Sequence, residues 1–116
     1  MTPSLTAVDI LAAELTVTGP KANATSGTPV ESELVLFADG ASELGIWEVT
    51  PGSFPARKSG VCELMHFVAG SGTITDADGT VHEIAPGVAI FQPDGWEGMW
   101  TVTSTVRKSY AIYSVR

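Results

Sequence analysis

Glu63 lies inside a stretch that is otherwise apolar enough to form a buried strand. From Val61 to Val68 the sequence reads VCELMHFV. A bare carboxylate in a protein core is costly unless another group pairs with it or donates hydrogen bonds to it. A buried, paired carboxylate can also act as an acid or a base, because burial and a charged partner shift its pKa. Glu63 is therefore a candidate catalytic residue, and its partner must be sought elsewhere in the chain.

The alternation of side chains along a strand predicts which neighbours share the face of Glu63. If Glu63 points inward, Met65 and Phe67 do so as well, and Met65 becomes a candidate binding residue. The opposite face then carries Cys62, Leu64, His66 and Val68. Because this second face is too apolar to remain comfortably in water, we expect a second subunit to cover it.

The last apolar segment, residues 106–115, supplies a candidate cation for Glu63. One of its faces is the more apolar and comprises Val106, Lys108, Tyr110 and Ile112. This face should lie inside, so Lys108 is predicted to point into the core and to pair with Glu63. A basic residue of the segment at 57–58 is the other candidate partner. Glu63 and Lys108 could act as base and acid, or the pair could be purely structural.

The composition suits one domain and narrows the classes of partner. The chain has 116 residues and a net charge of −7. An acidic chain is repelled by phosphates and by anionic membranes, so we expect neither nucleic acid nor a membrane as a partner. The single cysteine, Cys62, excludes an intrachain disulfide and suits a reducing cytoplasm.

The first residues of the chain predict an arm that precedes the main domain. Apolar residues recur at helical spacing between Leu5 and Leu15, and Thr6 lies three residues before Asp9, as in a capping box. We therefore expect a short helix there. Residues 17–31 are rich in Gly, Pro, Ser and Thr and are predicted to form a loop or a tail packed on the surface. The arm would span residues 1–31 and the main domain residues 32–116.

The main domain is predicted to be all-β. Eight short candidate strands lie at 33–38, 44–50, 61–68, 72–76, 80–85, 88–93, 98–104 and 106–115. Gly or Pro separates most of them, and DADG at 76–79 is typical of a hairpin turn. So many short strands at close spacing indicate a closed barrel or a double-sheet jelly roll.

Two stretches have the motif spacing of a known superfamily. Residues 52–70 read GSFPARKSGVCELMHFVAG, with Glu63 seven residues before the final glycine. Residues 87–98 read GVAIFQPDGWEG, in which a glycine, five residues, a proline, one residue and a second glycine follow one another. Together these stretches resemble the two motifs of the cupin superfamily, whose fold is a small jelly-roll β-barrel.

Three further stretches resemble a small single-domain cupin family related to the cupin domain of ureidoglycine aminohydrolase. They are GIWEVTPGSF at 45–54, GW-x-G-x-W at 95–100 and VRKSY at 106–110. The resemblance covers roughly residues 33–116 and implies a homodimer.

The departure from the metal-binding cupins concerns the ligands of the metal. Those proteins place two histidines before the acidic residue and a third in the second motif, and Glu63 falls on the acidic position. The upstream positions here hold Ala56 and Lys58, or Arg57 and Ser59, and the third histidine is replaced by Gly98. His66 and His82 fall at neither motif's ligand positions. The resemblance therefore implies that the usual metal site is missing, and we expect no metal cofactor.

The second motif also supplies aromatic residues that could form the walls of a pocket. Trp96, Gly98 and Trp100 share one face, and both indoles line the cavity if that is the face the third histidine would use. They could instead only fill the barrel, since indoles supply much buried area. The candidate binding residues are Arg57, Met65, Trp96, Trp100 and Tyr110.

The sequence favours a cupin-type protein with a pocket for a small polar metabolite inside the barrel. The pocket could bind only, or carry out proton transfer through Glu63 and Lys108. One alternative is a metal-dependent hydrolase or lyase acting on a ureido or amino substrate, with Glu63 and Gln92 or a partner's histidine as ligands. Another is a regulatory or accessory cupin without catalysis. The fold does not choose among these, and the residues do not identify the substrate.

Overall fold

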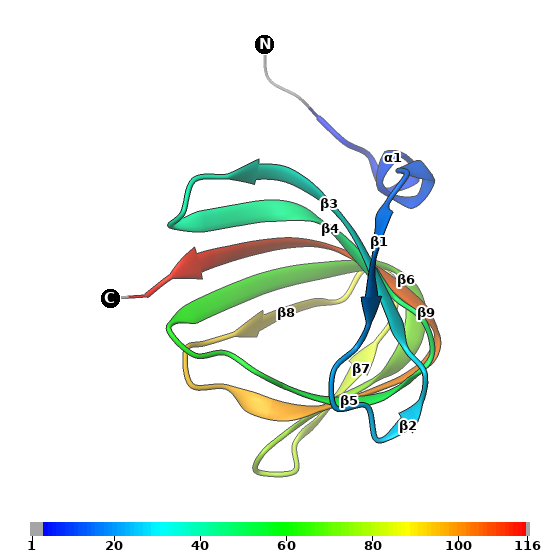
Figure 1. Cartoon of the computed structure of the whole chain (residues 1–116), viewed down its shortest axis with the longest axis vertical. Coiled ribbons are helices and arrows are strands. Elements are labelled where there is room, and N and C mark those ends of the chain that lie inside the picture. The colour runs from blue at the N-terminus through cyan, green and yellow to red at the C-terminus, as the bar shows by residue number, and fades with distance from the viewer. Residues whose placement is uncertain (1–3, 116) are drawn as a thin grey trace.

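The computed structural model describes residues 4–115 and shows a small β-barrel with a short N-terminal helix (Figure 1). The predicted fold class is confirmed. Within the described residues the elements are α1 (Ala7–Ala12), β1 (Thr16–Pro20), β2 (Ser26–Gly27), β3 (Val30–Ala38), β4 (Ser42–Val49), β5 (Gly52–Arg57), β6 (Val61–Asp76), β7 (Val81–Ile84), β8 (Ala89–Gln92) and β9 (Glu97–Ser114). No helix in this part of the chain is both long enough and apolar enough to cross a bilayer.

Two long antiparallel strands, β6 and β9, form the centre of the sheet. β9 pairs with β6 along nearly its whole length, while its other edge pairs with β5 and then with β4. β3 and β1 extend the sheet beyond β4, and β2 extends it beyond β5. β7 and β8 pair with successive parts of the far edge of β6. The sheet curls around an interior that the inner faces of these strands share (Figure 1).

Each long strand was predicted as two short ones, because small residues interrupt both sequences. The register between β6 and β9 shifts between Phe67 and Gly72, so the strands bend there without ending. Gly70 has a positive φ of 99°, and a side chain there would press on the backbone of Val106 at 2.5 Å. Glycine is thus needed where the two strands cross closely at the bend.

The N-terminal segment contains more strand than the sequence suggested. The helix is confirmed: the Thr6 hydroxyl accepts from the Asp9 amide, and the Asp9 carboxylate accepts from the Thr6 amide. Residues 17–31, however, hold most of β1 and all of β2, which pair with β3 and β5. β5 was likewise not predicted. β1 and β2 lie at sheet edges, and β5 lies between β9 and β2. All three short strands owe their conformation to the strands beside them, which local composition does not reveal.

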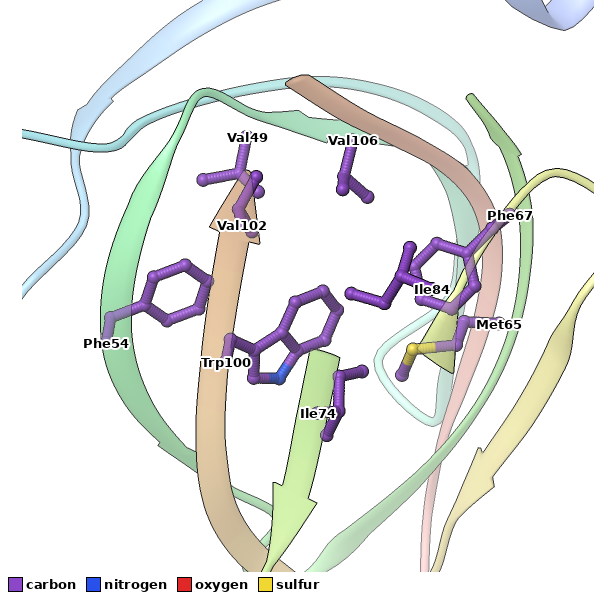
Figure 2. Packing of buried hydrophobic residues seen from close by; sticks show 9 residues of the cluster. All are labelled: Val49, Phe54, Met65, Phe67, Ile74, Ile84, Trp100, Val102 and Val106. Carbon is purple, nitrogen blue, oxygen red and sulfur yellow. The ribbon is translucent and has the colours of Figure 1, made fainter. Parts of the chain in front are cut away.

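The interior is divided between an apolar floor and a polar end. The floor is formed by Val49, Phe54, Met65, Phe67, Ile74, Ile84, Trp100, Val102 and Val106 (Figure 2). Trp100 stacks on Phe54, with ring centroids 5.7 Å apart, and meets Phe67 edge-on at 6.0 Å. The predicted inward direction of Glu63, Met65, Phe67 and Lys108 is confirmed, since all four side chains are buried.

Candidate functional site

Two lysines share the carboxylate of Glu63. The Lys108 ammonium donates to Oε2 at 2.6 Å, and the Lys58 ammonium donates to Oε1 at 2.6 Å. Only 2% of the surface of Glu63 is exposed. The structure therefore brings Lys108 to Glu63, as the strand alternation predicted, and adds the basic residue at position 58. The three side chains together carry one net positive charge.

The sheet fixes the direction of both lysines. Lys108 lies opposite Trp47 of β4 on one side and Phe67 of β6 on the other. Its ammonium is 4.4 Å from the ring centroid of Trp47 and 5.1 Å from that of Trp100, within cation–π range. Lys58 follows β5, where its backbone amide donates to the Trp96 carbonyl at 2.8 Å. Aromatic faces and backbone bonds thus hold two cations against one carboxylate.

Burial and charge act in opposite directions on these groups. Burial raises the pKa of Glu63, but the charges of Lys108 and Lys58 together lower it by more than burial raises it. The pKa of Glu63 therefore lies below the usual value. Burial also lowers the pKa of Lys108, and the charge of Glu63 opposes this shift only in part. Glu63 is therefore an ionised carboxylate in a buried site, which needs its two cationic partners.

A cavity of about 220 Å³ opens over this cluster. Its wall comprises Lys21, Glu31, Glu33, Glu43, Trp47, Phe54, Ala56, Lys58, Glu63, Trp100, Lys108, Tyr110 and Ile112. This volume is below the roughly 300–1,000 Å³ of pockets for drug-sized ligands, so a bound molecule would be a small metabolite.

The rim of the cavity is held by hydrogen bonds to glutamates. Glu31 accepts from the Lys21 ammonium at 3.1 Å and from the Trp47 indole at 3.0 Å. The Tyr110 hydroxyl donates to Glu43 at 2.8 Å. Burial, and then this bond to Glu43, raise the pKa of Tyr110, so it remains a phenol.

The predicted binding residues divide into two groups. Trp100 and Tyr110 line the cavity, whereas Arg57, Met65 and Trp96 do not. Met65 is fully buried beneath the cluster, with its sulfur 3.9 Å from the Lys108 ammonium. Arg57 is exposed and borders a separate open hollow beside Pro55 and Glu97. Its neighbour Lys58, the first residue after β5, lines the cavity instead.

Trp96 lies outside the cavity and has a structural role that its motif did not reveal. Its indole donates to Asp76 at 2.8 Å, and His82 bonds the other oxygen of the same carboxylate at 2.9 Å. The indole also packs over Gly98, where its Cζ2 atom lies 2.6 Å from the place a Cβ would occupy. Trp96 thus closes the hairpin end of the barrel.

Several lining residues were missed by the sequence reasoning. Trp47 shares a face with Gly45 and Val49, so strand alternation could have placed it inside. Lys21 could not have been found in this way, because it follows β1 in a segment predicted as loop. Gly45 lies opposite Tyr110 in the pairing of β4 with β9. A side chain at position 45 would meet the Tyr110 hydroxyl at 2.8 Å, so glycine leaves room for the Tyr110 ring.

The side chains at the positions of the cupin metal ligands do not fit a metal ion. Ala56 and Gly98 lie directly opposite each other on β5 and β9, and neither offers a donor. A side chain on Gly98 would also overlap the Thr75 carbonyl oxygen. Both oxygens of Glu63 already accept from ammonium groups, which repel a cation. Among residues 4–115, no three side chains of the His, Cys, Asp or Glu types come close enough to hold one.

Gln92, the other metal ligand that the hydrolase or lyase alternative would take from this chain, lies beside the cluster. It is directly opposite Glu63 in the pairing of β8 with β6, so both side chains face the interior. Its amide oxygen and nitrogen are buried and have no hydrogen-bond partner among the described residues. Buried amides normally have such partners.

Comparison with known proteins places the chain in a family. Residues 36–110 match the model of the EutQ-like cupin domain. A protein of unknown function from the DUF861 family of Pseudomonas syringae pv. tomato is 30% identical, with a TM-score of 0.77 over 87% of this chain and 45% of that chain. The chain therefore spans less than half of that protein.

Two further structures are similar to this chain. A DUF861-family protein from Thermotoga maritima is 29% identical, with a TM-score of 0.52 over 56% of this chain and 73% of that chain. The EutQ protein of Clostridium difficile is 22% identical, with a TM-score of 0.63 over 74% of this chain and 69% of that chain, and it supports the fold alone. No curated protein matches the sequence. The barrel, its motifs and the family match together show that this chain belongs to the EutQ-like cupin family.

Proposed function

We propose that the chain binds a small polar metabolite in the cavity over Glu63, without a metal ion. The observation that carries this proposal is the sharing of one buried carboxylate by Lys58 and Lys108, where the carboxylate, Glu63, stands at the position of the acidic metal ligand that the cupin resemblance implies. A fixed pair of ammonium groups offers a ligand oxygen the positive charge that a metal would otherwise supply.

The hydrogen-bonding capacity of the cluster supports a polar ligand. An ammonium group has three donors, and Lys58 uses one of them on Glu63. Both lysines line the cavity, so their remaining donors can reach a bound molecule. Trp47, Phe54 and Trp100 provide flat apolar walls beside these donors. Such a mixture of apolar walls and few polar groups is typical of sites for small molecules.

The catalytic form of the proposal uses Glu63 as the base and Lys108 as the acid in proton transfer. The binding-only form uses the same two residues to orient the ligand, and it covers a regulatory or accessory role. The metal-dependent hydrolase or lyase alternative has less support. Among residues 4–115, the strand register places Gln92 and Ile112 directly beside Glu63, and only Gln92 has a side-chain oxygen, which belongs to an amide. The single Cys62 supports a reducing, cytoplasmic setting.

We propose that the chain forms a homodimer, and that one row of apolar residues on the outer face of the sheet forms the interface. The row crosses β8, β6, β9, β4 and β3 and comprises Phe91, Leu64, Ala111, Leu44 and Phe37. The two adjacent rows also carry no Asp, Glu, Lys or Arg. One row comprises Cys62, Tyr113 and Ser42, and the other comprises Ala89, His66, Ser109, Ile46 and Leu34. A second copy is the favoured occupant, because two chains of charge −7 can approach closely only where neither presents charge.

The binding proposal can be tested with tryptophan fluorescence, since Trp47 and Trp100 line the cavity. EDTA-treated protein is titrated with a panel of small carboxylates, carboxamides and ureido compounds. At least one should change the emission, and Lys58→Met should abolish the change. Arg57→Met is the matched control, because the neighbouring Arg57 faces the other hollow, and it should leave binding unaltered. The proposal is wrong if binding requires an added divalent metal, or if purified protein holds stoichiometric metal bound to Glu63.

A further inference from the structure

The charges around the cavity are separated by strand. On the inner face of the sheet, Glu43 of β4 and Glu63 of β6 lie in one row with Ile112 between them. Glu33 of β3 and Lys108 of β9 lie in another row with Trp47 between them. Adjacent strands are about 4.8 Å apart, so roughly 10 Å separates the backbones within each pair. The acidic and the cationic sides of the cavity are thus different ends of one small space.

The two ends do not balance each other. Lys58, Glu63 and Lys108 together carry one positive charge, and the ion pair of Lys21 with Glu31 is neutral. Glu33 and Glu43 form no ion pair with any residue between 4 and 115, although both line the cavity. Within the described part of the chain, the Glu43 side chain accepts only from the neutral Tyr110 hydroxyl. One end therefore lacks an anion and the other lacks a cation.

We infer that the ligand is a small amphoteric molecule that carries a carboxylate and an ammonium group separated by a short carbon chain. Its carboxylate accepts from Lys58 and Lys108, and its ammonium group lies between Glu33 and Glu43. Its carbon chain lies against Trp47, which the register places between the two ends. This inference rests on the proposed function and adds the chemical class of the ligand.

Ligands with a single charge fit the cavity less well. A simple carboxylate would leave Glu33 and Glu43 without a cation, and it would add a further negative charge to the cavity. A simple amine would compete with Lys108 for the aromatic faces, because Lys108 already lies over Trp47 and Trp100. A molecule with both charges satisfies both ends and brings no net charge into the site.

The test is calorimetric titration of the full chain at neutral pH, in EDTA, with three probes of matched length. The probes are γ-aminobutyrate, butyrate, which lacks the amine, and butylamine, which lacks the carboxylate. We expect γ-aminobutyrate to bind at least about ten-fold more tightly than either of the others, which corresponds to about 1.4 kcal/mol. Glycine, whose charges are adjacent, should bind more weakly than γ-aminobutyrate.

The variants separate the two ends of the site. Glu33→Gln and Glu43→Gln should each reduce the preference for γ-aminobutyrate over butyrate several-fold, while butyrate binding is retained. Glu83→Gln on β7 is the matched control, because Glu83 is exposed and lies outside the cavity, and it should keep the full preference.

The inference is overturned if butyrate binds as tightly as γ-aminobutyrate, or if Glu33→Gln and Glu43→Gln leave the preference unchanged. In either case butyrate binding that depends on Lys58 would still support the proposed function. If none of the three probes binds, the amphoteric class is wrong, and the fluorescence panel decides the proposed function separately.

Discussion

The inner face of the sheet buries charged residues, and the outer face of the same strands exposes large apolar residues. On the inner face, Glu63 and Lys108 are charged, although only 2% and 5% of their surfaces are exposed. On the outer face, Leu64 and Phe91 are apolar, although 46% and 55% of their surfaces are exposed. Glu63 and Leu64 are adjacent in the sequence, so a single strand presents both conflicts.

Neither face has the residues that the folding of one chain alone would favour. Buried charges are replaced by apolar residues in most cores, because a buried ion pair is often no more stable than an apolar pair of the same shape. Large exposed apolar patches mark surfaces that another molecule covers. The proposed ligand would account for the inner face, and the proposed second subunit for the outer face.

The largest expected effect is the removal of Glu63. In Glu63→Leu, two lysines lose their common partner, and we expect a loss of about 3–5 kcal/mol of unfolding free energy, as for other broken buried pairs. Lys108→Met should cost less, because Lys58 still pairs with Glu63. The double variant should recover much of the loss, and denaturant unfolding of all four proteins gives the coupling energy. Additive single effects would mean that the two charges do not interact.

The outer row offers the next largest effect. Leu64→Glu and Phe91→Glu should each weaken the dimer by about 2 kcal/mol or more, because buried apolar positions dominate interface energies. Light scattering at micromolar concentration should show monomers with an unchanged circular dichroism spectrum. Val81→Glu is the control, since Val81 is equally exposed but lies outside the row, on β7. If the wild-type protein is monomeric under these conditions, the proposal that this face forms a dimer interface is wrong.

The smallest effect concerns Gln92, which lies on the inner face beside Glu63. Both polar atoms of its amide are buried without a partner among the described residues. An unsatisfied amide is destabilising, so Gln92→Met should leave the unfolding free energy unchanged or raise it by about 1 kcal/mol. A loss of more than about 1 kcal/mol in denaturant unfolding would show that a group in the cavity bonds the amide.

Sequence patterns predicted the parts of the molecule in which neighbouring residues decide the outcome. The alternation along 61–68 and 106–115 placed Glu63 and Lys108 inside, and Thr6 with Asp9 predicted the helix. The motif spacing indicated the cupin barrel. These features depend on residues two to seven positions apart, which a single sequence displays.

The remaining features depend on contacts between distant strands. Lys58 and Arg57 were equivalent in the sequence, because the direction of β5 is set by its pairing with β9. Trp96 was placed in the cavity by its motif, but its indole bonds Asp76, which lies 20 residues away. Glu33 and Glu43 resembled ordinary solvated charges, since only the register of β3 and β4 brings them to the cavity.

The most direct test of the central claim is the pKa of Glu63 itself, measured by carbon NMR on EDTA-treated protein. The claim is that Lys58 and Lys108, without a metal, hold a buried carboxylate in its charged form. The pKa of Glu63 should then lie below 4.5, its ordinary value, because the two lysines outweigh burial. A folded-state pKa below the unfolded value stabilises the protein above about pH 4.5, and this stabilisation is lost as the pH falls through the folded pKa. Lys58→Met should raise that pKa. A pKa above 4.5 in the EDTA-treated wild type would contradict the account.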